Sequence, residues 1–143
     1  MKTIVYATDG SAASETAGET VKDYLQAWPE AKVIVLYVTA KENYAYDLIP
    51  DVVNQHEAEV TKEIKQKIEK QYDKWHDRFE FAHRTGHPSP TICSFADEKD
   101  ANLIIIGSHG RGVIDRALLG SVTHSVLNRT KIPVLVVPEQ HSK

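Results

Sequence analysis

Short apolar runs and longer amphipathic segments alternate along this chain. Four runs are rich in β-branched and aliphatic residues: Thr3–Ala7, Lys32–Val38, Leu103–Ile106 and Pro133–Val137. A fifth run, Phe79–Arg84, alternates apolar and polar residues, which is typical of an edge strand. Because the four apolar runs are nearly continuous, we predict strands that are covered on both faces, as in a parallel sheet.

Helical periodicity fills the two longest segments between these runs. Over Ser11–Trp28 apolar residues recur every three or four positions, with Ser11 as the expected N-cap and Pro29 as the expected stop. These apolar positions are Ala13, Ala17, Val21, Tyr24 and Trp28. Over Asp51–Asp77 a single apolar stripe is expected to face the core: Val53, Val60, Ile64, Ile68, Tyr72 and Trp75. The other faces of this segment carry Glu and Lys together, which indicates a solvated surface.

Two shorter helices complete the pattern. The turn Gly86–Pro88 precedes a segment with Ser89 as the expected N-cap and Pro90 as the expected first helical residue. The last helix is expected over Gly120–Arg129, with Leu127 among its apolar positions.

The alternating order of strands and helices predicts one doubly wound α/β domain over residues 1–143, because parallel neighbours need helical crossovers. Ligands bind such sheets beyond the carboxyl ends of the strands. Four ranges are therefore candidates for a site: Thr8–Ser11, Val38–Ala40, Thr85–Pro88 and the residues from Gly107 onward.

Composition narrows the classes of function. Of 143 residues 41% are hydrophobic, and the formal net charge of −3 argues against non-specific binding of nucleic acid. Cys93 is the one cysteine, which excludes an internal disulfide and a cysteine-based zinc site. No apolar stretch approaches the roughly 20 residues that span a bilayer, and the first ten residues lack the pattern of a signal peptide. We therefore expect a cytoplasmic protein that binds neither nucleic acid nor membranes.

The loop after the fourth apolar run carries the most informative motif. Gly107 and Gly110 form G-x-x-G, and nine residues later Gly120 and Ser121 open an apolar helix. Glycines let the backbone approach a ligand closely, and the N–H groups of a helix N-terminus attract phosphate. Any one of these glycines favours a simple glycine-rich connection, whereas the whole set favours phosphate binding. The spacing fits neither the Walker A loop nor the G-x-G-x-x-G fingerprint, and no G-x-S-x-G hydrolase motif is present.

The motif and its surroundings resemble the ATP-binding subclass of the universal stress protein family. The family pattern G-x-x-G, nine residues, G-[S/T] fits without a gap within the segment IIIGSHGRG…LLGSVTHSVL…PVLVVP. The resemblance extends over the whole chain, from IVYATDGS at the start through VIVLYV in the second run. It implies a Rossmann-like, five-stranded parallel sheet in the order 3-2-1-4-5 with helices on both faces. It also implies an adenine nucleotide at the carboxyl edge and a homodimer.

The resemblance implies roles for individual residues. Asp9 would lie near the ribose and phosphates and would hold a divalent cation, Mg²⁺ or Mn²⁺; its alternative role is that of a turn or cap residue. Ala7 and Thr8 would flank the base, and Val38 would end the strand that contacts adenine. The remaining residues would form the ribose and phosphate cradle: Gly107, His109, Gly110, Arg111, Gly120, Ser121 and Val122.

Other features are open to two interpretations. The dimer would form through the edge strand Pro133–Val137, unless the tail Glu139–Lys143 shields that edge. The loop Lys41–Pro50, with its two tyrosines, is either a lid or an ordinary surface loop. Five histidines show no metal-ligand spacing, and we expect them at the surface or in structural positions: His56, His76, His83, His87 and His141. His124, one turn beyond Ser121, is expected to pack or to lie at the surface.

Three functions follow from these observations. The first is a stress-response or signalling protein that holds ATP as a regulatory ligand, with AMP or cyclic AMP as alternatives. The second is a slow ATPase or phosphotransferase, for which Asp9 with a bound metal is the one candidate residue. The third is an interaction module without nucleotide, against which the intact glycine motif argues.

Overall fold

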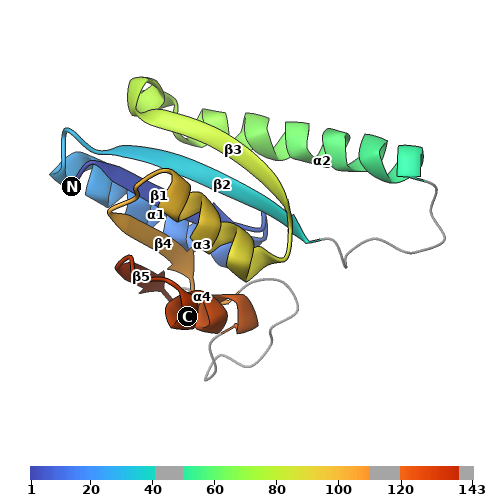
Figure 1. Ribbon diagram of the computed structural model, residues 1–143. Helices are drawn as coiled ribbons and strands as arrows, with labels where there is room; N and C mark the ends of the chain where they lie inside the picture. The colour runs from blue at the N-terminus through green and yellow to red at the C-terminus, as the bar shows by residue number, and fades with distance from the viewer. Residues whose placement is uncertain (41–49, 110–119, 139–143) are drawn as a thin grey trace, which may run out of the picture.

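The computed structural model describes residues 1–40, 50–109 and 120–138, with the side chains at 12–14 and 50–54 left aside. Within these residues the strands are β1 (Thr3–Thr8), β2 (Lys32–Ala40), β3 (Phe79–Gly86), β4 (Leu103–Gly107) and β5 (Val134–Val137). The helices between them are α1 (Ala12–Ala27), α2 (Pro50–Gln71), α3 (Pro88–Glu98) and α4 (Ser121–Arg129), with a 3₁₀ segment, η2, over Asp73–Arg78. Figure 1 shows how they surround the sheet.

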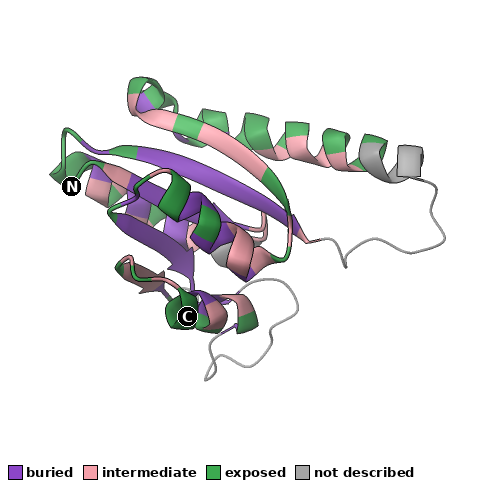
Figure 2. Cartoon of the chain, viewed as in Figure 1, coloured by how far each residue is buried: buried purple, intermediate pink, exposed green. Residues whose placement is uncertain are grey.

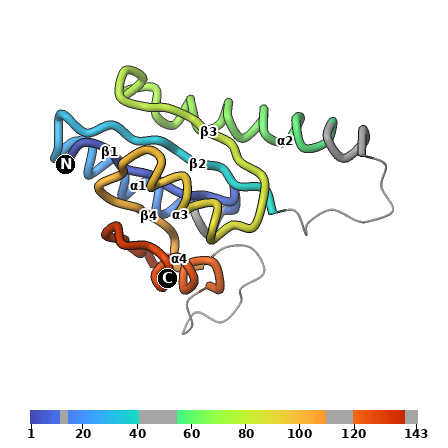
Figure 3. The backbone as a smooth tube through the Cα atoms, viewed as in Figure 1, coloured from blue at the N-terminus to red at the C-terminus, as the bar shows by residue number. Residues whose placement is uncertain are grey.

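The strands form one sheet in the order β3-β2-β1-β4-β5, and each neighbouring pair is parallel. This confirms the predicted α/β fold and its strand order. The alternating run of β3 lies at one edge, as expected, and the aliphatic β5 lies at the other. The path in Figure 3 shows the chain winding from β1 toward β3 and then returning to β4 and β5.

Each central strand sends alternate side chains into two separate cores. Ile4 packs with the buried residues of α1 and α2, whereas its neighbour Val5 packs with those of α3 and α4. Both side chains are fully buried, and the central strands are coloured as buried over most of their length in Figure 2. The two-sided burial is the physical reason for the continuous apolar runs in the sequence.

Helix α1 departs from the predicted stripe at its end. Ser11 occupies the N-cap position as predicted, but its side chain makes no capping hydrogen bond to the helix. Leu25, which the predicted stripe did not include, is fully buried, while Trp28 is 45% exposed. The helix ends at Ala27, so Trp28 leaves the helical face that the periodicity assigned to it.

The predicted helix over residues 51–77 is two elements. Helix α2 ends at Gln71, and Trp75 within the following 3₁₀ segment has non-helical angles (φ −113°, ψ 27°). Tyr72 and Trp75 are nevertheless buried, and the Tyr72 hydroxyl donates to the carbonyl of Gly18 at 2.9 Å. At Ile64, Ile68, Tyr72 and Trp75 the stripe therefore identifies residues that lie in the core or pack against it, although the backbone changes direction before β3. Val60 is half-buried, and the side chain of Val53 lies outside the described residues. None of the described helices has both the length and the apolar character needed to cross a membrane.

Arg78 ties the end of this 3₁₀ segment to the end of α1. Its guanidinium donates to four carbonyl oxygens at 2.9–3.1 Å, those of Leu25, Trp28, Pro29 and Ala31. The last carbonyls of a helix lack intrahelical donors and carry partial negative charge. Helix α1 has no basic residue in its own last turn. Arg78, from a distant part of the sequence, therefore supplies the positive charge that stabilises these carbonyls.

We expect Arg78→Ala to lower the free energy of unfolding by about 2 kcal/mol, because hydrogen bonds to a charged donor contribute roughly 1.5–3 kcal/mol and partial exposure reduces the sum. Arg78→Lys should recover less than half of the loss, since one ammonium group lacks the planar fork of the guanidinium. Urea unfolding followed by circular dichroism measures both variants. An unaltered midpoint for Arg78→Ala would contradict this role.

Candidate functional site

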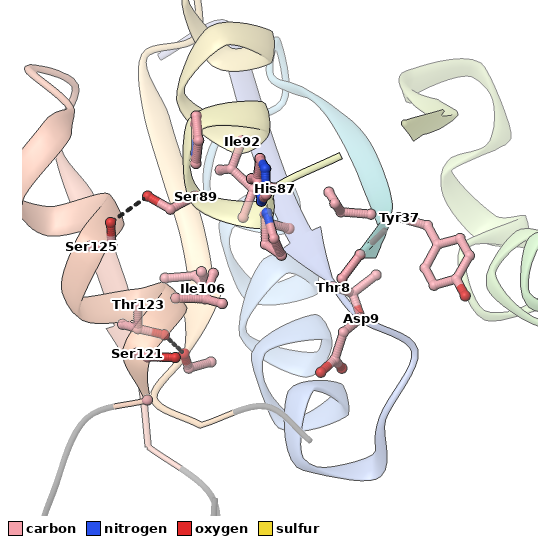
Figure 4. A pocket seen from close by; sticks show the side chains of 18 of the residues that line it. Thr8, Asp9, Tyr37, His87, Ser89, Ile92, Ile106, Ser121, Thr123 and Ser125 are labelled. Carbon is pink, nitrogen blue, oxygen red and sulfur yellow. Dashed lines mark hydrogen bonds between the residues drawn. The ribbon is translucent and has the colours of Figure 1, made fainter. Parts of the chain in front are cut away.

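A cavity of about 490 Å³ lies at the carboxyl ends of β1, β2 and β4 (Figure 4). Strands β1 and β4 are neighbours, and the chain winds away from β1 toward β2 on one side and from β4 toward β5 on the other. The cavity therefore lies at the point where the winding direction reverses, which is where open parallel sheets bind ligands. Its volume is within the usual range of small-molecule sites.

The turn after β1 forms the floor of the cavity. Thr8 and Asp9 line it, and their side chains also hold the turn: Thr8 Oγ1 accepts the N–H of Gly10 at 3.0 Å, and Asp9 Oδ1 accepts the N–H of Ser11 at 2.9 Å. Gly10 has φ +81°, and a Cβ there would lie 2.9 Å from Cδ1 of Ile64. Asp9 thus has the turn role considered as its alternative, and its side chain also lines the cavity.

The two halves of the glycine motif meet in space. The N–H of Gly120 donates to the carbonyl of Ser108 at 2.8 Å, and Thr123 Oγ1 donates to the carbonyl of Gly107 at 2.7 Å. These bonds fasten the start of α4 to the end of β4, whatever the path of the loop between them. Four lining residues come from this junction: Gly107, Gly120, Ser121 and Thr123.

Helix α4 begins at the cavity with its first N–H groups available to a ligand. Gly120 is the N-cap residue, and it has no side chain that could cap the helix. Helical geometry leaves the N–H groups of Ser121, Val122 and Thr123 without intrahelical acceptors. All three residues line the cavity, which gives that wall partial positive charge.

Helix α3 closes the opposite side of the cavity and begins earlier than predicted. His87 is the N-cap residue and Pro88 the first helical residue, in place of Ser89 and Pro90. The buried Ser89 instead donates from its hydroxyl to Ser125 Oγ of α4 at 2.8 Å, as Figure 4 shows. The hydrogen bond links the two helices across the cavity wall.

A small cluster supports the side chains of β2 at the cavity. The His83 ring stacks on Tyr37 with centroids 5.3 Å apart, and its Nε2 is 2.9 Å from Thr39 Oγ1 and 3.4 Å from Glu57 Oε1. Burial lowers the pKa of His83 below its ordinary value, against the opposing effect of Glu57. The neutral ring thus holds Tyr37 and Thr39, which both line the cavity.

The described lining residues carry little charge. Asp9 is the one carboxylate among them, and none is Lys or Arg. His109 is buried, with its Nδ1 2.9 Å from Ser108 Oγ. The described part of the chain contains no group of three or more His, Cys, Asp or Glu that could hold a metal ion. Backbone N–H groups are therefore the main described source of positive potential at the cavity.

Comparison with known proteins places the chain in a family. Residues 1–138 match the sequence model of the Universal stress protein family. The chain belongs to this family. Universal stress protein MJ0531 of Methanocaldococcus jannaschii is 30% identical over 143 aligned residues, which cover 95% of this chain and 81% of that protein. Universal stress protein MJ0577 of the same organism is 27% identical over 157 aligned residues, with coverage of 99% and 97%.

Solved structures of universal stress proteins share the fold. The structure of MJ0577 matches with a TM-score of 0.81 at 31% identity in the structural alignment, covering 99% of this chain and 98% of the other. A crystal structure of a universal stress protein in complex with cAMP matches with a TM-score of 0.68 at 26% identity, covering 97% and 98%. The family fold predicted from the glycine motif is thereby confirmed.

Nine of the eleven residues that the universal stress protein resemblance singled out line this cavity: Ala7, Thr8, Asp9, Val38, Gly107, His109, Gly120, Ser121 and Val122. The other two, Gly110 and Arg111, lie outside the described residues, as does most of the loop Lys41–Pro50.

Several lining residues were not predicted. Sequence reasoning assigned His87 to the surface or to a structural position and did not consider Tyr37, Ser89 or Ser125 as part of a site, yet all four line the cavity. The range Thr85–Pro88 after β3 did include His87 by topology. Ser125 lies four residues after Ser121 and therefore on the same face of the helix. This helical spacing could have predicted Ser125 as a lining residue, although the glycine motif itself ends at Ser121.

Proposed function

We propose that this universal stress protein binds an adenine nucleotide, ATP, in the cavity and uses it as a regulatory ligand in a stress-response or signalling role. The observation that carries the proposal is the junction of the glycine motif, where the N–H of Gly120 donates to the carbonyl of Ser108. This bond places the uncapped start of α4 at the cavity. An uncapped helix N-terminus at a sheet edge is a favourable site for phosphate.

The distribution of polar and apolar groups supports one orientation of the nucleotide. The phosphates lie at the start of α4, near the N–H groups of Ser121, Val122 and Thr123. The base lies in the carbon-rich part of the cavity, which is lined by Ala7, Val38, Ile92 and Ile106. The cAMP complex of a universal stress protein that is 26% identical to this chain supports a ligand with an adenine base.

A divalent cation fits the proposed site as a companion of the nucleotide. Mg²⁺ is usually held by one or two carboxylates together with phosphate oxygens and water. Asp9 lines the cavity, and the bond from the N–H of Ser11 occupies its Oδ1. We propose that its carboxylate holds Mg²⁺ or Mn²⁺ against the phosphates, where the cation offsets the repulsion between like charges.

The nucleotide itself is tested by mass spectrometry of the small molecule released when purified protein is denatured. We expect ATP in an amount close to one per chain. Recovery of AMP or cyclic AMP in its place would change the ligand and keep the site. Release of no nucleotide, together with no heat of binding on titration with ATP, would refute the proposed function.

We expect Asp9→Asn to weaken ATP binding about 10-fold in the presence of Mg²⁺ and by less than about 2-fold in EDTA, because the carboxylate favours binding only through a cation. Calorimetric titration under both conditions measures the difference. An equal loss with and without Mg²⁺ would assign Asp9 to the turn or to the ribose instead. ATP turnover that disappears in this variant would favour the slow ATPase.

We also propose that two copies of the chain pair through β5. The carbonyls of Pro133 and Val137 accept hydrogen bonds from the N–H groups of Ile104 in β4 and of Ser108 just after it. Because backbone groups alternate along a strand, those of Val134 and Val136 point away from β4. This edge is aliphatic and half-buried, whereas the β3 edge carries Glu80 and Arg84. An aliphatic edge with unpaired backbone groups favours pairing with a second copy about a two-fold axis.

A further inference from the structure

An exposed imidazole stands at the cavity on the turn between β3 and α3. His87 lines the cavity but is exposed, whereas His109, which also lines it, is buried. Figure 4 shows the His87 side chain beside Ile92. The turn follows β3, so His87 approaches from the β3 side of the sheet, and α4 approaches from the β4 and β5 side.

The backbone on both sides of His87 is conformationally restricted. Gly86 has φ +156°, and a Cβ at this position would lie 2.9 Å from Thr91 Oγ1, so the turn requires glycine. Pro88 disfavours the helical region for the residue before it, and His87 has φ −74° and ψ 122°. The imidazole is thus presented from a rigid turn, which lowers the entropy lost when it contacts a ligand.

The start of α3 is a poor site for phosphate, although it faces the same cavity. Pro88 and Pro90 have no N–H to donate, and the Ser89 hydroxyl already donates to Ser125 Oγ. The wall beside His87 is instead rich in carbon, from both prolines and Ile92. A carbon-rich wall with one aromatic side chain suits the flat face of a base.

We propose that His87 is a specificity-determining residue whose imidazole packs against the purine ring of the bound nucleotide. The inference rests on the proposed function, because it needs a nucleotide with its phosphates at α4. A purine offers more ring area to the imidazole than a pyrimidine does. The stacking therefore contributes to a preference for ATP over UTP, and it makes no contribution to the binding of the phosphate chain alone.

The test compares His87→Ser with His87→Phe. Serine is a favourable N-cap residue and keeps the start of α3, while phenylalanine keeps an aromatic face without ring nitrogens. Titration calorimetry with ATP, UTP and inorganic tripolyphosphate gives three affinities for each protein. Stacking of a base on an aromatic side chain predicts a loss of about 10-fold for ATP in His87→Ser, with tripolyphosphate changed by less than about 2-fold. His87→Phe should bind ATP within about 3-fold of the unaltered protein.

The outcomes separate this inference from the proposed function. ATP affinity unchanged in His87→Ser would overturn the inference and leave the proposed function intact. An equal loss for ATP and tripolyphosphate, or a loss in His87→Phe as large as in His87→Ser, would overturn stacking as well. Failure of the unaltered protein to bind ATP would overturn the proposed function and the inference together. Matching thermal unfolding curves of the two variants check that α3 is intact.

Discussion

Gly120→Val should reduce the affinity for ATP at least 100-fold, a loss of about 2.8 kcal/mol, while the protein stays folded. Gly120 is the N-cap residue of α4 and lines the cavity. Its angles, φ −62° and ψ 152°, are accessible to valine, so the backbone need not move. A branched side chain at this point takes the space that phosphate needs next to the N–H groups of the helix.

Two control variants separate the contributions at this helix start. Gly120→Ala adds one methyl group and should lose less affinity than valine. Ser121→Ala removes a hydroxyl and keeps the backbone N–H, so its loss should be below about 10-fold if the backbone dominates the phosphate contact. Calorimetric titration with ATP and circular dichroism of each variant give affinity and fold. A folded Gly120→Val protein with unaltered affinity would remove the glycine motif from the site.

Val136→Pro should raise the dissociation constant of the proposed dimer roughly 100-fold. In a two-fold dimer each substitution is present twice at the interface. The loss of one outward N–H per chain therefore removes two intermolecular hydrogen bonds, each contributing about 1–1.5 kcal/mol. The outward direction of this N–H follows from the β4 contacts of Pro133 and Val137. Proline is tolerated on an edge strand where the N–H faces away from the sheet.

Val136→Ala is the matched control for this experiment. It shortens the side chain, which is half-buried and packs against the core on the α3 and α4 face, and it keeps the N–H. The alanine variant should therefore lose some stability and stay dimeric. Sedimentation equilibrium over a range of concentrations measures both. If the unaltered protein is monomeric over that range, or if the proline variant stays dimeric, β5 is not the interface.

The sequence predicted most of the fold because local pattern and global fold agree. The apolar runs became strands whose alternate residues enter two cores, as Ile4 and Val5 do. The alternation of apolar and polar residues in Phe79–Arg84 was enough to identify an edge strand. Helix ends were less predictable. Trp28 continues the periodicity of α1 but lies past its end, and Leu127 continues that of α4 but is 40% exposed.

The resemblance to the universal stress protein family, which the glycine motif carries, allowed nine lining residues to be named in advance. The spacing of the motif, with a strand before it and a helix after it, by itself indicated only the end of β4 and the start of α4. That information is local in the chain. Asp9 and Val38 were accessible for a related reason, since strand ends in a parallel sheet meet at one edge. The sequence pattern by itself thus determined the parallel sheet and the edge at which the cavity lies, whereas the strand order followed from the family resemblance.

Only the tertiary structure decided which side chains complete the cavity. Ser89 donates a hydrogen bond to Ser125, and His83 stacks on Tyr37; in both pairs the two residues are more than thirty positions apart in the sequence. Arg78 likewise donates a hydrogen bond to the carbonyl of Leu25 near the end of α1, from a distant part of the sequence. Such pairings depend on the distance between helices and on the residue at which each helix begins. Helix α3 begins two residues earlier than predicted, so His87 and not Ser89 is its N-cap residue. Periodicity reports which face of an element is buried; the partners on that face are set by packing in three dimensions.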